Sequence, residues 1–521
     1  MRIVYICFAI CALLPIIFGY RILGVFPIPS KSHYYVGQSL MQGLAERGHE
    51  VTVISPFKEK KPIKNYNEIF IDNSYDWFHA GKDNFVNYNQ LNFIDVTFGW
   101  YEVGQNITRW TLKNKNFQNF LKSNQHFDVI VVEVCLIESL FGLMHHFNAP
   151  MIGTSAFGAS HWTTDLVGSP NFASYVPHTN THYSDQMSFL ERFHNSLFFW
   201  TEMILYSRYH LPIQQQMMEN NFPNTKNWPS LAQMRKNISL VLLNTHVTYG
   251  TPRPYAPNMI EVGGMQIRQN IEPLPTKIQT FLDEAKNGAI FFSLGSNVLL
   301  TKLPQHQLQA IRNAFSDHPN IRILIKSDEK IIIPSHKTKD VLIEPWFNQQ
   351  SILAHPNIKL FVTHGGLLST TESIYFGKPM VGIPVMFDQH LNMRIADQKG
   401  YGLCVPIEDL SANKIRSAVN KVLENESYRT QAQITSERYR DLLKNPVETG
   451  VFWVEHVAKN KGAPHLRSVA VDLTFYQLYN LDCWALVGVV LILMLFAFRT
   501  FIRLTISSFS SNAKLDKAKR S

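Results

Sequence analysis

The sequence predicts an α/β protein with two domains, each built on a doubly wound parallel sheet. Its 521 residues exceed what one hydrophobic core usually organises. Short apolar runs alternate with segments of helical periodicity, which is the pattern of βαβ units. A stretch from 251 to 275 that is dense in Pro and Gly separates two such series, as domain linkers do.

The first series opens with an apolar strand at 22–26, a helix from Ser32 to Arg47 and a strand at 51–54. Ser32 is the expected N-cap of this helix, and His33 lies in its first turn. Ligands of doubly wound folds gather at the carboxyl ends of the strands, so a reacting group is expected at His33. The positive end of the helix disfavours an imidazolium, which keeps the ring able to accept a proton. The competing interpretation is a surface histidine.

A later strand at 128–132 ends at Glu133, which we expect at the same sheet edge as His33. These two residues are far apart in the sequence, so only the fold can bring them together. Glu138 competes for the role of partner to His33. For Glu133 itself, a solvated turn or a helix cap is the alternative.

Two segments of the first series give weaker signals. Residues 58–125 show little periodicity and are predicted to form loops and irregular helices. Residues 149–236 are rich in aromatic and Met side chains, which we expect to pack as helices against the sheet. The same residue types also build pockets for apolar ligands, and contact with a membrane surface is a third interpretation.

The second series has a turn at Gly295-Ser-Asn297 and a tryptophan, Trp346, directly after a short strand. An indole in that position can fill a core, but its flat face can also stack on a nucleobase. The elements expected in this series before residue 350 are strands at 289–294, 321–325 and 341–343 and a helix at 304–315.

The stretch from Phe361 to Gln389 gives the clearest indication of a ligand-binding site in the chain. An apolar strand at 360–362 runs into His364, Gly365 and Gly366, and a helix then extends to about Gly377. A helix entered in this way points free backbone N–H groups and its positive end at a ligand, most often a phosphate. Two glycines alone more often mark a tight turn. The same stretch delivers further polar side chains to this sheet edge, namely Ser369, Glu372, Asp388 and Gln389.

The composition narrows the class of protein. With 45% hydrophobic and 17% charged residues the chain is globular and rather apolar. The net charge of +9 is spread along the chain, so we expect no nucleic-acid partner. Of the five cysteines, only Cys135 and Cys404 lie outside the terminal apolar segments, and buried free thiols are expected there rather than a disulfide.

The two ends of the chain predict a membrane protein of the secretory pathway. Residues 1–19 have the charge, length and small exit residue of a cleaved signal peptide. Residues 481–501 surround a charge-free run and are predicted to span a membrane once, with 502–521 as a basic cytosolic tail. The final residues resemble a dilysine-type retrieval signal, which predicts the endoplasmic reticulum membrane with the rest of the chain in the lumen. Asn-x-Ser/Thr sites at Asn106, Asn237 and Asn425 are compatible with that route.

The stretch from Phe361 to Gln389 resembles the signature of the UDP-glycosyltransferases, with a His-containing Gly turn, a Glu, two prolines and a terminal Asp-Gln at matching separations. The resemblance covers nearly the whole chain and is closest to insect members. It implies a GT-B fold of two facing Rossmann-like domains, with an acceptor-binding domain at 20–262 and a linker at 263–288. The UDP-sugar domain then spans 289–470 and includes a last helix that returns to the first domain.

The resemblance also assigns roles to individual residues. His33 matches the family's catalytic base, and Glu133 stands where the family has its partner Asp. Leu368 stands where many relatives carry Asn. The positions that match donor contacts are Ser293, Trp346, Gln349, His364, Gly366, Ser369, Glu372, Asp388 and Gln389. No cofactor is implied beyond the UDP-sugar co-substrate, and without an Asp-x-Asp pair we expect no metal.

The predicted function is the inverting transfer of a hexose from a UDP-sugar to a hydroxyl of a small lipophilic acceptor. Resemblance to insect members favours UDP-glucose. A glucuronate donor is one alternative, and a catalytically silent protein that binds lipophilic ligands is another, because Glu133 replaces the family Asp. The sequence leaves the acceptor unidentified, and a homo-oligomer stays open.

Overall fold

The computed structural model describes residues 19–72, 92–296, 298–315, 320–327, 329, 331–333 and 338–519. The predicted signal peptide, apart from Gly19, and Asn297 lie outside these residues. The chain forms two compact units, Met1–Arg467 and Ser468–Ser521, and each is described by itself.

The first unit contains a parallel sheet of seven strands in the order β3-β2-β1-β4-β5-β6-β7. The order reverses between β1 and β4, which are neighbours in register, with Val25 opposite Val132. Such a switch point is where doubly wound sheets bind ligands. The strands are β1 Arg21–Val25, β2 Glu50–Ser55, β3 Tyr66–Phe70, β4 Val129–Glu133, β5 Met151–Ser155, β6 Val241–Leu243 and β7 Met259–Glu261.

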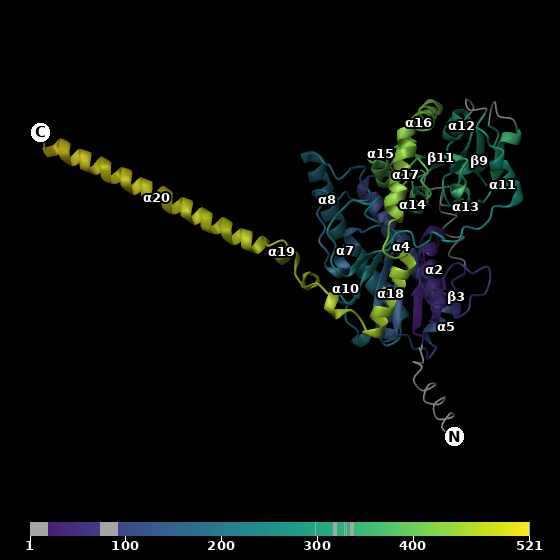
Figure 1. Ribbon diagram of the computed structural model, residues 1–521. Helices are drawn as coiled ribbons and strands as arrows, with labels where there is room; N and C mark the ends of the chain where they lie inside the picture. The colour runs from purple at the N-terminus through teal and green to yellow at the C-terminus, as the bar shows by residue number, and fades with distance from the viewer. Residues whose placement is uncertain are drawn as a thin grey trace, which may run out of the picture. The chain divides into compact units, whose positions relative to one another are not determined.

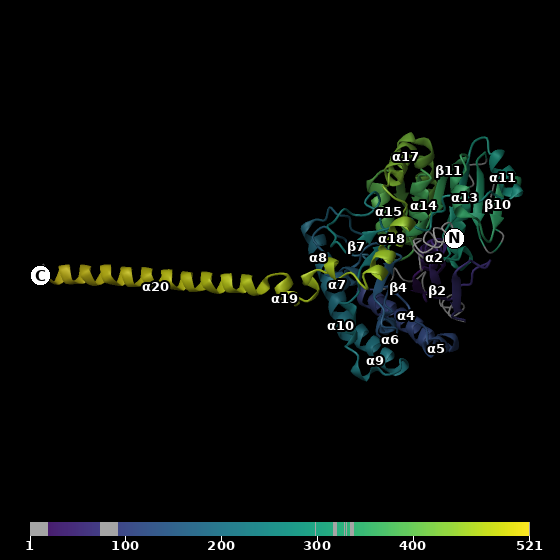
Figure 2. The same ribbon diagram turned by 60° about the horizontal axis from the view of Figure 1, so that its bottom comes forward.

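Helices cover both faces of this sheet (Figures 1 and 2). The inner strands β1, β2, β4, β5 and β6 are therefore buried on both sides, which explains their mostly apolar sequences. The helices are α2 Lys31–Glu46, α4 Phe93–Lys113, α5 Lys115–Leu121, α6 Gly142–His146, α7 His161–Val167, α8 Phe189–Leu205, α9 Leu211–Asn221 and α10 Leu231–Arg235. A π-helical turn, Tyr206–His210, joins α8 to α9.

Two expectations for this half were wrong. Ser30, not Ser32, is the N-cap of α2, because Ser30 is the last residue with an extended backbone. The described part of 58–125 contains strand β3 and the regular helices α4 and α5, where loops and irregular helices were predicted. The buried face of α4 includes Thr97, Gln105 and Thr108, and these polar residues hide its helical period.

Helix α8 also differs from the expectation that its apolar residues pack inward. Its fully buried residues are Asn195 and Glu202, which hydrogen-bond to the segment before the helix. The apolar residues Phe189, Phe193, Leu197 and Trp200 are exposed instead. Because the interior contact is polar, the hydrophobic stripe faces outward.

The second half of the same unit holds a six-stranded parallel sheet in the order β10-β9-β8-β11-β12-β13. Its switch point lies between β8 and β11. The strands are β8 Ala289–Ser293, β9 Arg322–Lys326, β10 Val341–Glu344, β11 Ile358–Thr363, β12 Met380–Gly382 and β13 Gly402–Cys404. The helices are α11 Thr276–Asp283, α12 Gln305–Ala314, α13 Gln349–Ala354, α14 Leu367–Tyr375, α15 Gln389–Gln398, α16 Ala412–Glu424, α17 Glu426–Arg440 and α18 Pro446–Lys459. We call the parts built on the two sheets the N-terminal and C-terminal halves.

Helices α11 and α18 correspond to the predicted linker at 263–288 and to the predicted last helix that returns to the first domain. Helix α11 lies within 263–288, and its Ile278 and Leu282 belong to the core of the second sheet, so that segment is not merely a connection. Helix α18 packs against α2, and its Val451 and Val454 join the core of the first sheet. The end of the C-terminal half therefore returns to the N-terminal half.

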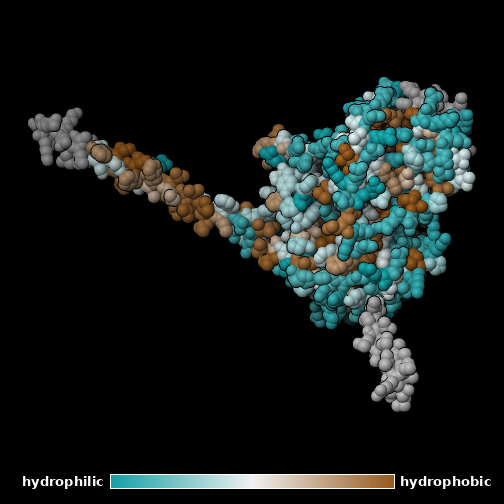
Figure 3. Space-filling view, viewed as in Figure 1, coloured by the Kyte–Doolittle hydropathy of each residue, from teal (hydrophilic) through white to brown (hydrophobic). Residues whose placement is uncertain are grey.

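The second unit consists of α19 Phe475–Leu478 and the long helix α20 Leu481–Lys519. Among the described residues, Leu481–Ser510 is the one helical segment with the length and apolar composition of a membrane span, with a mean hydropathy of 2.5. Figure 3 shows apolar side chains along this helix. The predicted span at 481–501 lies within it. Cys135, Cys404 and Cys483 are free thiols, and the first two are half-buried.

Candidate active site

His33 and Glu133 meet at the switch point of the first sheet. His33 follows β1, Glu133 is the last residue of the adjacent β4, and Nδ1 of His33 is hydrogen-bonded to Oε1 of Glu133. A carboxylate accepts, so Nδ1 donates and Nε2 keeps its lone pair. The edge of the Phe157 ring packs on the imidazole, with centroids 5.0 Å apart. This arrangement fixes the ring and leaves one nitrogen able to take a proton.

Glu133 is 2% exposed, and its second oxygen has no hydrogen-bond partner among the described residues. A buried oxygen without a partner is unfavourable for folding and is typical of groups retained for function. Glu138, the alternative partner, accepts hydrogen bonds from Tyr206 at 2.7 Å and His210 at 2.9 Å. The fold therefore pairs His33 with Glu133 and assigns Glu138 to a separate buried network.

His364 occupies the corner between β11 and α14, at the switch point of the second sheet. Its ring is packed between two glycines. A Cβ atom on Gly295 would lie 2.4 Å from Cε1 of the ring, and one on Gly366 would lie 2.5 Å from Nε2. Burial and the nearby Lys326 lower the pKa of His364 to about 3, so the ring is neutral at pH 7. It can act on an anion only through a ring N–H, beside the free N–H groups at the start of α14.

Glu372 lies inside a network of amide donors. Gln349 donates to one oxygen at 2.6 Å and Gln350 to the other at 3.0 Å, and Gln349 also donates to Ser369 at 3.1 Å. Burial raises the pKa of Glu372 to about 7, and the two amides act in the opposite direction. Gln350 was missed by the sequence reasoning, since it carries no motif of its own.

Asp388 and Gln389 begin α15. Burial raises the pKa of Asp388 to about 6, opposed by a 2.8 Å hydrogen bond from Asn392 and by the His33 imidazole. The side-chain oxygen of Gln389 accepts from the backbone N–H groups of residues 385 and 386, which holds the preceding loop. Asn392 also donates to the carbonyl of Gly365, a tie that the sequence did not reveal.

Trp346 and Ser293 complete the predicted donor positions. Ser293 ends β8, and its hydroxyl accepts from the N–H of Gly295 at 3.3 Å. Trp346 follows β10 and is 48% exposed, so one part of the indole is available to a ligand. Lys326, at the end of β9, donates to the carbonyl of Gly295 at 2.6 Å and lies 4.6 Å from the centre of the indole ring.

The two switch points face each other. The rings of Trp100 in α4 and Phe387, just before Asp388, have centroids 3.8 Å apart. Leu368 in α14 packs against the core of the first sheet. Lys31, two residues before His33, reaches the Trp346 ring at 4.3 Å. These contacts place the part of the N-terminal half that carries His33 against the part of the C-terminal half that carries Trp346 and the start of α14.

One cluster outside these residues has the composition of a metal site. His161, His178 and Glu202 offer ligand atoms within 4.8 Å of one another. However, Nδ1 of His178 accepts from the backbone N–H of Asn180, so Nε2 carries the proton and donates to Glu202. That nitrogen then has no lone pair for a metal, and the cluster is better explained as a hydrogen-bonded anchor of the segment before α8.

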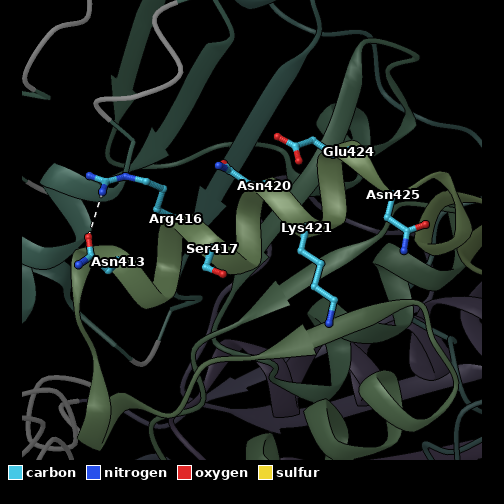
Figure 4. A pocket seen from close by; sticks show the side chains of 7 residues that line it. All are labelled: Asn413, Arg416, Ser417, Asn420, Lys421, Glu424 and Asn425. Carbon is cyan, nitrogen blue, oxygen red and sulfur yellow. Dashed lines mark hydrogen bonds between the residues drawn. The ribbon is translucent and has the colours of Figure 1, made fainter.

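A polar groove also runs along α16 and the start of α17 (Figure 4). Its lining contains none of the predicted donor or catalytic residues. The residues are Asn413, Arg416, Ser417, Asn420, Lys421, Glu424 and Asn425.

Comparison with solved structures agrees with this architecture. The chain is similar to the glycosyltransferase of kitacinnamycin, with a TM-score of 0.56 and 14% identity over 84% of this chain and 99% of that chain. It is also similar to CalG4, the calicheamicin glycosyltransferase, with a TM-score of 0.54 and 15% identity over 86% of this chain and 100% of that chain. At these identities the likeness concerns the fold. Two facing Rossmann-like sheets of this kind define the GT-B fold.

Sequence comparison identifies the family. The profile described as "UDP-glucoronosyl and UDP-glucosyl transferase" matches residues 23–520. UDP-glycosyltransferase UGT5 of Dactylopius coccus is 32% identical over 91% of both chains, and UDP-glucosyltransferase 2 of the same insect is 31% identical over 96% of both. UDP-glucuronosyltransferase 1A8 of Homo sapiens is 28% identical over 90% of this chain and 88% of the human one. The protein belongs to the UDP-glycosyltransferase family and is an enzyme that uses a UDP-sugar donor, as the sequence predicts.

Proposed function

We propose that the protein transfers glucose from UDP-glucose to a hydroxyl of a small lipophilic acceptor, with His33 as the general base. The observation that carries this proposal is the hydrogen bond between His33 and buried Glu133, at the switch point that faces the C-terminal half. A base requires a free ring nitrogen, an orienting carboxylate and a position beside the donor sugar. His33 meets these requirements.

The reaction is a single displacement. Nε2 of His33 removes the acceptor proton as the hydroxyl oxygen bonds to the anomeric carbon, and the bond from that carbon to the β-phosphate oxygen breaks. UDP leaves with the electron pair, and Glu133 stabilises the imidazolium that has formed. Attack from the face opposite UDP inverts the anomeric centre, so an α-linked donor gives a β-glycoside.

The C-terminal half holds the donor. The diphosphate lies at the start of α14, where backbone N–H groups, His364 and Ser369 meet the charge that develops on UDP. Glu372 accepts from the ribose hydroxyls, within its network of Gln349 and Gln350. The uracil stacks on Trp346, beside Ser293 and its turn. No metal is required by this arrangement.

Similarity to insect relatives supports glucose over glucuronate, because the signature that contains Asp388 and Gln389 is shared by enzymes that use either donor. Among the relatives, the insect protein named UDP-glucosyltransferase 2 is more similar than the human glucuronosyltransferase. Turnover with UDP-glucose against UDP-glucuronate, measured with a panel of small hydroxylated acceptors, tests the choice. A preference for UDP-glucuronate would change the proposed donor and leave the other steps of the mechanism unchanged.

The general base is tested by His33→Ala. We expect this variant to lose transfer while it still binds UDP, because His33 belongs to the other half from the donor site. Unchanged turnover in the variant refutes the assignment. Transfer activity of the wild type would exclude the alternative of a catalytically silent ligand carrier. The hydrogen bond between Glu133 and His33 supports catalysis, because Glu, although one methylene longer than the family Asp, still contacts the base.

The cellular setting follows from both ends of the chain. The predicted signal peptide at residues 1–19 and the candidate span within Leu481–Ser510 support an orientation with both catalytic halves in the lumen of the endoplasmic reticulum. The basic tail then lies in the cytosol. Protease protection of the catalytic part in sealed microsomes, with an antibody epitope on the tail left accessible, tests this orientation.

A further inference from the structure

The Trp346 ring has two ammonium groups within cation–π distance. The Nζ atom of Lys326 lies 4.6 Å from the ring centroid, and that of Lys31 lies 4.3 Å from it. Lys326 belongs to the C-terminal half and Lys31 to the N-terminal half. A uracil stacked on Trp346 must share this ring with both cations or displace one of them.

The two lysines are held differently. Lys326 is fixed by its 2.6 Å hydrogen bond to the carbonyl of Gly295. Lys31 has the ring contact but no hydrogen bond or ion pair with any residue in the described ranges. The side chain of Lys31 is therefore the one that is free to move when a base arrives.

The surroundings of Lys31 favour an anion. It is the first residue of α2, whose positive end repels cations, and the first turn of that helix has no acidic residue. Lys31 is also half-buried, and the charge of Lys60 acts on it. An ammonium group in this position lacks a negative partner, and it points at the half that holds the donor.

We infer that Lys31 is a donor-binding residue that leaves the face of Trp346 when uracil stacks there and forms an ion pair with the diphosphate of UDP. The inference rests on the proposed function, because it requires a UDP-sugar at α14. Lys31 lies two residues before His33 in the same helical turn. Its ion pair with the diphosphate therefore draws the base toward the anomeric carbon and connects the two halves only when donor is bound.

The test is calorimetric binding of UDP and of uridine to the full-length protein in detergent. Lys31→Met keeps the aliphatic stem and removes the charge. We expect it to weaken UDP binding roughly fivefold, the size of one partly exposed ion pair, and not to weaken uridine binding, because uracil then displaces no cation from Trp346. Lys31→Arg restores the charge and is expected to restore the affinity for UDP.

Lys58→Met is the matched control. Lys58 also lies over an aromatic ring, that of Phe70 at 4.5 Å, so the control removes a charge and a cation–π contact away from the donor. UDP affinity that is unchanged in Lys31→Met, or lowered equally in the two Met variants, overturns the inference. Equal losses for UDP and uridine also overturn it, because Lys31 would then act on the base. Failure of the wild type to bind UDP would instead overturn the proposed function itself.

Discussion

The imidazole rings of His182 and His390 lie parallel across the two halves, with centroids 4.1 Å apart and planes inclined by 6°. His390 follows Gln389 in α15, and His182 belongs to the segment before α8. Burial and the neighbouring His182 lower the pKa of His390 to about 4. At neutral pH the His390 ring is uncharged, and the contact attaches the start of α15 to the N-terminal half.

This contact predicts a loss of stability in mild acid. The unfolded chain protonates residue 390 near its ordinary pKa of about 6.5, whereas the folded chain does so only near pH 4. The unfolded state therefore binds more protons between these values, and stability falls as the pH drops from about 6.5 to 4.

Urea unfolding at pH 7.5 and pH 5 measures the effect. We expect His390→Asn to reduce the difference in unfolding free energy between the two pH values by about 1–2 kcal/mol. His306→Asn is the control, because His306 is exposed on α12. An equal pH dependence in wild type and His390→Asn would show that the stacked pair is not the source.

The His33–Glu133 pair predicts separate effects of charge and of length at position 133. Glu133→Gln keeps the size but cannot stabilise the imidazolium, so we expect kcat to fall about 10²–10⁴-fold with little change in the KM for the donor. Glu133→Asp keeps the charge and is expected to lose less. Steady-state kinetics with saturating acceptor distinguish these effects.

Glu138→Gln is the comparison for the same experiment. Glu138 is buried with Tyr206 and His210, away from the base, so its loss is expected to lower the Tm while the folded enzyme keeps its kcat. If Glu138→Gln lowered kcat as strongly as Glu133→Gln, the assignment of Glu133 as the partner of His33 would fail.

The packing of His364 predicts that Gly295 is needed for donor binding. Gly295 has φ +76°, and a Cβ atom there would overlap the His364 ring. We expect Gly295→Ala to weaken UDP binding about tenfold or more, through displacement of that ring. In Gly48→Ala the backbone is similarly strained at φ +99°, but no atom lies within 4 Å of the new methyl group. That control should lose about 1–2 kcal/mol of stability and keep its affinity for UDP. Equal UDP affinities in the two variants would contradict the role of the clash.

The sequence predicted the parts of the fold that local patterns determine. Strands buried on both faces appear as continuous apolar runs, and the His364 to Gln389 stretch lies on one strand, helix and strand that are consecutive in the chain. Contacts between distant segments left no such pattern. Gln350, Asn392 and Lys326 act only because the fold brings them to Glu372, Gly365 and Trp346.

The least predictable element was α8. Its apolar residues indicated a helix that packs through them, yet Asn195 and Glu202 form the buried side. The reason is the polar segment that the helix must hold. Asn195 donates to the carbonyls of Ala173 and Val176, and Glu202 accepts from His178. Hydrogen bonds between residues this far apart in the chain leave no periodic pattern in the sequence.

The three Asn-x-Ser/Thr sites are not equivalent in the structure, which predicts where glycans are attached. Asn237 is exposed in a loop, and Asn425 is exposed at the end of α16 (Figure 4). The side-chain oxygen of Asn425 accepts from the N–H of Ser427, which leaves its nitrogen toward solvent. Asn106 lies inside α4, and Thr108 of the same site is fully buried. Glycosylated asparagines usually lie in surface loops, so only the first two sites meet the requirement.

We expect the protein from a secretory host to lose mass on treatment with an N-glycanase, and the loss to be smaller in Asn237→Gln and in Asn425→Gln. Asn106→Gln is the matched control and should leave the shift unchanged, because the structure predicts no glycan there. The double variant Asn237→Gln, Asn425→Gln should show no shift at all. A glycan on Asn106 alone would contradict the ranking by exposure. Absence of any glycan on the wild type would contradict the luminal orientation proposed for the catalytic part, since only a chain that enters the lumen meets the glycosylation machinery.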